Sequence, residues 1–330
     1  MLWLVFGAVV VAAISIGMAW EARETQQARI RHKPPGRLVK TTVGDMHAIV
    51  RGKRLHPSDP VVILEGGLMA NSLAWRWVLD GLAQDYQLLA FDRLGHLWSG
   101  NRKTPLTCAA MNDELEALLS ALELKPPYIL VGHSFGGLGA RSFAARHANE
   151  ITGMVLVDTV SEHWADGLAS NPSLPFWIAV RLARIGLLRL FSKPAKTPTE
   201  PLSLEETNAY RALSSSARDM STVYESVRTL PANARSAASA DNAATRVIVV
   251  ASENAWEKGA FLPKGMTLAA ANAEHGPLQE KLAQKFEGSL YWSTRESDHE
   301  IPWRQPELVI RAVRRLAKNA PPTPAAPLID

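Results

Sequence analysis

YILVGHSFGGLGAR, residues 128–141, passes from a row of apolar side chains into a cluster of glycines that encloses Ser134. Such an apolar run is typical of a strand buried on both faces, and the residues after it have a helical pattern. Residues 132–136 fit G-x-S-x-G at the turn between the two. Glycines allow a turn too sharp for side chains, so we expect a strained Ser134 with its hydroxyl above the carboxyl edge of a sheet. The other interpretation is a glycine-rich turn whose serine has no role.

Short apolar runs of the same kind recur along the chain, and helix-like windows separate them. A hairpin precedes them, with two extended segments around Gly44-Asp45. The alternation predicts an α/β fold: a mostly parallel sheet with helices on both faces. The predicted buried strands are 61–65, 88–92, 128–132, 154–158, 247–252 and 290–293. The predicted helices are 73–84, 108–124, 137–150 and 305–318.

The alternation is interrupted between residues 161 and 235, where no comparable strand occurs. An apolar helical pattern with arginines, a proline-rich break and a second helical pattern follow one another there. We therefore interpret 161–235 as a helical cap inserted into a sheet domain made of 37–160 and 236–318. Residues 319–330 are rich in proline, and we predict that this tail is disordered.

Residues 1–20 carry no charged side chain, and a helix needs about 20 apolar residues to cross a bilayer. The segment predicts a membrane anchor. The competing interpretation is a cleavable signal peptide, which has basic residues before a shorter apolar core and a small-x-small cleavage site. A basic linker, 21–36, follows. Because the positive charges all follow the span, the positive-inside rule predicts that the rest of the chain is cytoplasmic.

Composition excludes some classes of function. The net charge is +4, and residues 21–37 contribute most of it. The sequence has no basic stripe with interleaved aromatic residues, so it does not favour nucleic-acid binding. The single cysteine, Cys108, excludes an internal disulfide framework. No group of His, Cys and carboxylate residues has the spacing of metal ligands, so we predict neither a metal nor another cofactor. The oligomeric state is left open.

A serine hydroxyl is a weak nucleophile at neutral pH and needs a histidine base, which in turn needs a carboxylate to orient it. His299 is the best candidate for the base. It lies between the last predicted strand and the last predicted helix, and it completes the chain order nucleophile, acid, histidine. The other histidines lie in linkers, on the hairpin, on loops or in helical stretches such as the one that contains His275. His133 is next to the serine but is expected to point away from it.

Three further segments, taken with the elbow, resemble the α/β-hydrolase superfamily over residues 37–318. VVILEGGLMANSLAW (61–75) resembles the strand and oxyanion loop of that family. FDRLGHLWSG (91–100) resembles its D-R-x-G-x-G-x-S segment, and SDHEIPWRQPELV (297–309) resembles its histidine loop. The resemblance implies that the oxyanion hole consists of the backbone N–H groups of Phe135 and Leu68.

The carboxylate that would orient His299 has three candidates. In many relatives it follows the strand that 247–252 resembles, but Ala255 stands at that position here. Other members carry the acid after the preceding strand, where this chain has Asp158. We therefore predict Asp158 as the acid, with Glu253 as the second candidate and Glu162 as the third. The alternative for Asp158 is an aspartate that only caps a strand end.

The resemblance implies a serine hydrolase that cleaves an ester-like small molecule through a Ser-His-Asp triad. Epoxide hydrolases and haloalkane dehalogenases of the same superfamily have an aspartate at the elbow, so the serine here argues against those reactions. The second hypothesis, kept open by the missing acid, is a catalytically inactive fold used as a binding module. Apolar cap residues and the anchor favour a hydrophobic ester, although these side chains could equally pack on the sheet. These residues are Phe176, Trp177, Leu182 and Leu187.

Overall fold

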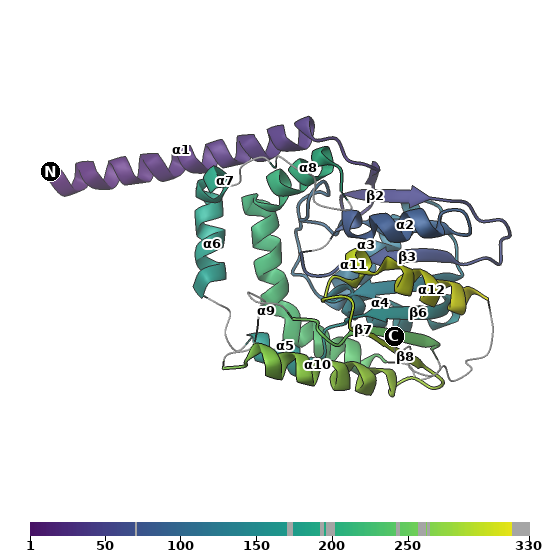
Figure 1. Ribbon diagram of the computed structural model, residues 1–330. Helices are drawn as coiled ribbons and strands as arrows, with labels where there is room; N and C mark the ends of the chain where they lie inside the picture. Colours follow the sequence, from purple (N-terminus) through teal and green to yellow (C-terminus); the bar gives the residue numbers. More distant parts are fainter. Residues whose placement is uncertain are drawn as a thin grey trace.

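An eight-stranded sheet forms the centre of the computed structural model (Figure 1). The structure describes residues 1–69, 71–169, 174–191, 195, 202–241, 245–256, 262 and 265–318, without the side chains of 168–169 and 174–176. The strand order is β1-β2-β4-β3-β5-β6-β7-β8. The first two strands are antiparallel to their neighbours, and the others are parallel. The predicted α/β fold with a mostly parallel sheet is confirmed. The strands are β1 (Arg37–Lys40), β2 (Asp45–Arg51), β3 (Val61–Glu65), β4 (Gln87–Phe91), β5 (Tyr128–His133), β6 (Ile151–Val157), β7 (Val247–Ser252) and β8 (Leu290–Thr294).

Helices cover both faces of the sheet, because successive residues of a buried strand point to opposite sides. In β3, Ile63 packs with one group of helices and Val62 and Leu64 with the other. The first group is α3 (Cys108–Ala121), α4 (Gly136–Arg146) and α10 (Leu268–Ala283). The second is α2 (Arg76–Leu82) and α12 (Pro306–Ala317). Short helices η1 (Ser72–Trp75), η2 (Ala148–Glu150) and α11 (Ile301–Arg304) lie in the connections.

A helical segment stands between β6 and β7, as Figure 1 shows. The long helix α9 packs against α5 and α6 and also against α4 of the sheet domain, so it joins the segment to the core. The boundary expected at residue 235 falls inside α9, which continues to Ser239. Buried Ala237 near its end packs with Leu138 of α4 in one apolar cluster. The helices are α5 (Glu162–Ala169), α6 (Leu174–Arg184), α7 (Leu187–Phe191), α8 (Leu204–Ser214) and α9 (Ala217–Ser239).

The first helix, α1 (Leu2–Arg31), is continuous and projects from the body of the molecule (Figure 1). Its N-terminal part is exposed and apolar, with a mean hydropathy of 2.4 over the most apolar window. By length and composition, this helix could cross a membrane. The linker predicted at 21–36 is instead helical as far as Arg31. The reason is that Glu21 and Ala28 are buried against the body. The proline-rich tail 319–330 lies outside the described residues.

Candidate active site

Ser134 lies at the sharp turn between β5 and α4. Its φ of +52° is in the left-handed region, which residues other than glycine adopt only at a cost in free energy. The flanking glycines make this turn possible. A Cβ added at Gly132 would lie 2.6 Å from Gly137 Cα, and one added at Gly136 would lie 2.3 Å from the Glu65 carbonyl oxygen. The turn therefore holds Ser134 at the carboxyl end of β5.

His299 lies in the loop between β8 and α11, and its ring faces Ser134. Its Nε2 is 2.9 Å from Ser134 Oγ. Two hydrogen bonds fix the loop: the His299 N–H donates to the Ala255 carbonyl oxygen at 3.0 Å, and His133 Nε2 donates to the His299 carbonyl oxygen at 2.9 Å. The hydroxyl and the imidazole are therefore within hydrogen-bond distance on a well-supported backbone.

Asp158 directly follows β6, with a left-handed φ of +42° and a side chain that is almost fully buried. Its Oδ2 lies 3.2 Å from His299 Nδ1, and its Oδ1 accepts the Ser252 N–H at 2.8 Å. A continuous chain of hydrogen bonds thus runs from the Ser134 hydroxyl through His299 to Asp158. A nucleophile, a base and an orienting acid use this arrangement in hydrolases.

The other carboxylates predicted as candidates lie elsewhere. Glu253 is on the surface, where it accepts hydrogen bonds from Ser293 at 3.0 Å and from Arg295 at 2.6 Å. Glu162 is in α5 and pairs with Arg141 and Lys285, at 3.1 and 3.0 Å. Neither carboxylate forms a hydrogen bond with His299 among the described contacts.

Burial and hydrogen bonding act in opposite directions on the pKa values of Asp158 and His299. Burial raises the pKa of Asp158, but the charge and hydrogen bond of His275 and the bond to His299 outweigh it and hold that pKa well below its usual range. Burial lowers the pKa of His299, but the hydrogen bond and charge of Asp158 outweigh it and raise that pKa. Asp158 is therefore an anion at neutral pH and favours the imidazolium that forms when His299 takes a proton.

His275 is a contact of this site that sequence reasoning missed. It is buried in α10, and its Nε2 lies 2.9 Å from Asp158 Oδ1. The Asp158 carboxylate therefore accepts three donors, from Ser252, His275 and His299. The one local signal for His275 is that it is a polar residue on the buried face of α10. This signal does not indicate Asp158 as its partner, because α10 reaches Asp158 only through the fold.

Replacing His275 with alanine should destabilise the fold by about 2–4 kcal/mol, because a buried carboxylate loses a donor. The pKa of Asp158 is lower in the folded chain than its unfolded value of about 3.9. The stabilisation that the Asp158 carboxylate provides is therefore complete above that pH and declines in acid. The difference in free energy of unfolding between wild type and His275→Ala should be largest at neutral pH and should become smaller below a pH of about 4. Denaturant unfolding in mild detergent, repeated across pH, measures both effects.

The control for this variant is His163→Ala, because His163 is an exposed histidine on α5. Its Nε2 lies 3.7 Å from Glu274 Oε2. Its loss should change the free energy of unfolding by less than about 0.5 kcal/mol. If His275→Ala were no less stable than His163→Ala, the hydrogen bond from His275 to Asp158 would contribute nothing to the free energy of unfolding.

Two tryptophans cover the outer side of the histidine. The Trp256 ring stacks on His299 with centroids 5.0 Å apart and an interplanar angle of 22°, and Trp164 stacks on Trp256 at 4.5 Å and 19°. Trp256 also meets the His275 ring edge-on at 5.5 Å. An aromatic face attracts a cation, so this stack orients His299 and favours its protonated form.

The N–H groups predicted for the oxyanion hole belong to Phe135 and Leu68. In the described part of the chain, neither the Phe135 nor the Leu68 backbone N–H has an acceptor. The loop that carries Leu68 lies against the serine, since a Cβ added at Gly67 would be 3.1 Å from Ser134 Cβ. Buried Arg93 holds this loop by donating to the carbonyl oxygens of Gly66 and Gly67, the first at 2.7 Å.

A cavity of about 580 Å³ lies beside the oxyanion loop and the histidine loop. Met69 and Glu300, the neighbours of Leu68 and His299, both line it. Trp177 and Leu187, which were expected either near the substrate or packed on the sheet, do not line it and are exposed. Leu182 is half-buried, and the Phe176 side chain lies outside the described residues. The other lining residues are Asn71, Ala74, Leu202, Thr207, Tyr210, Arg211, Trp303 and Arg304.

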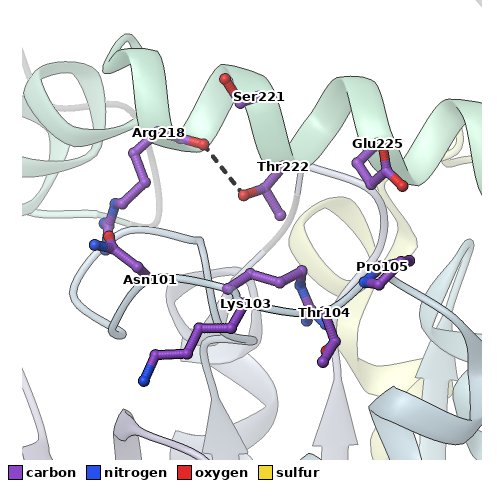
Figure 2. Close-up of a pocket in the computed structure, with 9 residues that line it drawn as sticks. Asn101, Lys103, Thr104, Pro105, Arg218, Ser221, Thr222 and Glu225 are labelled. Carbon is purple, nitrogen blue, oxygen red and sulfur yellow. Dashed lines mark hydrogen bonds between the residues drawn. The ribbon is translucent and has the colours of Figure 1, made fainter.

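A second hollow, of about 660 Å³, lies between the loop 101–105 and one side of α9 (Figure 2). Residues 101–105 line one side of it, and Arg218, Ser221, Thr222 and Glu225 of α9 line the other. It is open, and its lining includes neither a residue of the hydrogen-bond chain nor a sequence neighbour of one, so it is distinct from the candidate active site. Within the described ranges, no group of three or more His, Cys, Asp and Glu side chains is placed to hold a metal ion.

The order of the strands and the strained serine after β5 agree with a comparison to known families. A family model described as alpha/beta hydrolase fold matches residues 59–236. The chain belongs to this family. Solved structures support the same fold: the enol-lactonase from Burkholderia xenovorans LB400 superposes with a TM-score of 0.60 at 17% identity, over 86% of this chain and all of that one. At this identity the likeness concerns the fold alone.

Curated relatives match over only part of their length. The chain is 36% identical to the "Probable transporter efuK" of Hormonema carpetanum over 122 residues, which is 36% of this chain and 18% of that protein. It is 31% identical to the uncharacterized protein YqjL of Bacillus subtilis over 119 residues, 36% of this chain and 47% of that protein. The match thus spans less than half of each relative.

Proposed function

We propose that the protein is a serine hydrolase that cleaves carboxylic esters of small molecules through an acyl-enzyme. The observation that carries the proposal is the hydrogen-bond chain from Ser134 Oγ through His299 to Asp158, at 2.9 and 3.2 Å. The N–H groups of Phe135 and Leu68 also support it: neither has an acceptor among the described residues, and the loop that carries Leu68 lies against the serine. One structural neighbour is named an enol-lactonase, and a lactone is a cyclic ester.

In this mechanism, Ser134 Oγ attacks the ester carbonyl carbon while His299 Nε2 takes the hydroxyl proton. The negative charge that develops on the carbonyl oxygen is stabilised by the N–H groups of Phe135 and Leu68, each worth about 3–4 kcal/mol of barrier. His299 then protonates the leaving alcohol, and the acyl group stays on the serine. A water molecule, deprotonated by His299, attacks the acyl-serine and releases the acid. Asp158 keeps the imidazole in the tautomer that both steps need.

The alternative function, a catalytically inactive binding module, depended on the missing acid at position 255. Ala255 is buried, and its carbonyl oxygen accepts the His299 N–H. The carboxylate beside His299 comes from Asp158 instead. These contacts favour the enzyme over the binding module.

The substrate proposal rests on the cavity beside the oxyanion loop, whose walls include Met69, Leu202, Tyr210 and Trp303. Apolar walls favour an ester with a hydrophobic acyl or alcohol part. With a series of p-nitrophenyl esters of increasing acyl length, we expect the full-length protein in mild detergent to hydrolyse the longer esters faster than the acetate. A protein that hydrolyses none of them faster than its Ser134→Ala variant would contradict the proposal.

We also propose that α1 anchors the protein in a membrane. The structure of residues 17–31 supports an anchor over a cleaved signal peptide, because they continue the helix and pack on the body. A Cβ added at Gly17 would lie 2.7 Å from the Ile185 carbonyl oxygen, and Glu21 pairs with Arg189 at 2.7 Å. The basic residues that follow the span favour a cytoplasmic catalytic domain.

A further inference from the structure

Helices α6 and α7 expose a row of large apolar and basic side chains. Phe191 and Leu190 are 81% and 60% exposed. The neighbouring side of α6 carries Val180 and Ala183, which are buried, and α6 packs on α9. The row therefore has no partner among the described residues. We call it the α6–α7 face: Trp177, Ile178, Arg181, Arg184, Leu187, Leu190 and Phe191.

The charge of this face is uniformly positive. Residues 174–191 contain three arginines and no acidic residue. Arg181 stacks over the Trp177 ring at 4.6 Å, and Arg184 is exposed beside it. A helix with aromatic and aliphatic side chains among arginines is typical of a segment that lies in the headgroup region of a bilayer, where anionic lipids attract the basic groups.

The face lies where α1 leaves the body of the molecule. Figure 1 shows α7 directly against α1 and α6 running away from it across its axis, while the N-terminal half of α1 projects beyond both. Close contacts fix this arrangement: a Cβ added at Gly186 would lie 2.5 Å from the Trp20 ring. The junction between α1 and the two helices is therefore tightly packed.

A buried ion pair secures the same junction. Glu21 is only 3% exposed and accepts hydrogen bonds from Arg189 Nε and Nη2, at 2.7 and 2.9 Å. It also accepts hydrogen bonds from the Thr25 hydroxyl and the Ala217 N–H. Arg189 belongs to α7. A movement of α7 away from α1 would leave a buried charge without its partner, which is costly. The α6–α7 face thus keeps its position relative to the span.

Helix geometry sets the level of this face. Twenty residues of α-helix rise about 30 Å, which is the thickness of the hydrocarbon core. If residues 1–20 fill that core, its edge lies at Trp20, and Gly186, which directly precedes α7, lies at the same level. Tryptophan is enriched at this boundary, so Trp20 and Trp177 are suited to it.

We propose that the α6–α7 face rests in the headgroup region of the bilayer that α1 spans, with Arg181 and Arg184 on anionic phospholipid. The inference rests on the proposed membrane span, and it adds a second membrane contact, made by the cap itself. The cap is then held at the lipid surface rather than free in solution.

The test uses full-length protein reconstituted in vesicles of phosphatidylcholine with phosphatidylglycerol. Three variants, each with one added cysteine, are labelled with an environment-sensitive dye. Phe191→Cys reports on the face, Val9→Cys on the span, and Leu55→Cys is the exposed control in the β2–β3 loop. The native Cys108 should stay unlabelled, because burial raises the pKa of its thiol to about 11. Lipids that carry a spin label in the acyl chain quench a dye within the bilayer.

We expect the dyes at positions 9 and 191 to lose fluorescence when spin-labelled lipid is added, the latter most with a label near the headgroup, and the dye at 55 to be unaffected. Arg181→Gln with Arg184→Gln should weaken the docking of the face by about fivefold per charge in the anionic vesicles. Quenching at 9 but not at 191 would overturn this inference and leave the span intact. Absence of quenching at both would overturn the span as well.

Discussion

Replacement of Ser134 by alanine is expected to lower kcat for ester hydrolysis by about 10⁶-fold, the loss seen when a triad nucleophile is removed. The alanine has no atom that can form the acyl-enzyme, while His299, Asp158 and the two N–H groups of the oxyanion hole remain. A residual rate of about 10³–10⁴ over water is expected from those groups alone. Steady-state kinetics with the best p-nitrophenyl ester measure the change.

The matched control is Ser239→Ala, another serine-to-alanine change at the end of α9. The Ser239 hydroxyl is exposed and donates to the Arg235 carbonyl oxygen, away from the cavity. This variant should keep the wild-type kcat and KM. Equal activity of the Ser134→Ala and Ser239→Ala proteins would rule out Ser134 as the nucleophile.

Replacement of Asp158 by asparagine should lower kcat by about 10⁴-fold with little change of KM. The asparagine amide can present an N–H to His299 Nδ1, which stabilises the wrong tautomer and leaves Nε2 unable to accept the serine proton. The same variant removes the negative charge that raises the pKa of His299. The pH at which activity is half-maximal should therefore fall, since His299 must be neutral to act as the base.

Glu253→Gln is the control for this change, because Glu253 was the second candidate for the acid. Its carboxylate is at the surface and binds Arg295 and Ser293. We expect turnover within about twofold of wild type, as for most surface substitutions. Loss of turnover in Glu253→Gln, with Asp158→Asn unaffected, would show that the assignment of the acid is wrong.

The sequence predicts the parts of this molecule that local patterns determine. Apolar runs mark β3 to β7 because both faces of these strands are buried, and the glycines around Ser134 mark a turn that other residues cannot make. Asp158 could be named because it follows a predicted strand, at the place where some members of the family that the chain resembles carry the acid. Each of these signals lies within a few residues of the feature that it predicts.

The contacts of α10 and of the tryptophan stack could not be predicted in this way. His275 and Asp158 are 117 positions apart, and they meet because α10 packs beside β7. Trp164 lies in α5 of the inserted segment, whereas Trp256 follows β7, and the two rings stack. The continuation of α1 to Arg31 depends on the burial of Glu21 against Arg189, a partner far away in the chain. Such pairings are properties of the tertiary structure rather than of any window of sequence.

The most direct test of the central claim is the reaction of the full-length protein with a fluorophosphonate, followed by mass spectrometry of the labelled peptide. A fluorophosphonate reacts with a serine only where a base activates the hydroxyl. The hydrogen-bond chain from Ser134 to Asp158 predicts one phosphonyl group on the peptide that contains Ser134, and none in the Ser134→Ala variant. A folded protein that takes up no phosphonyl group, or carries it on another residue, would contradict the account.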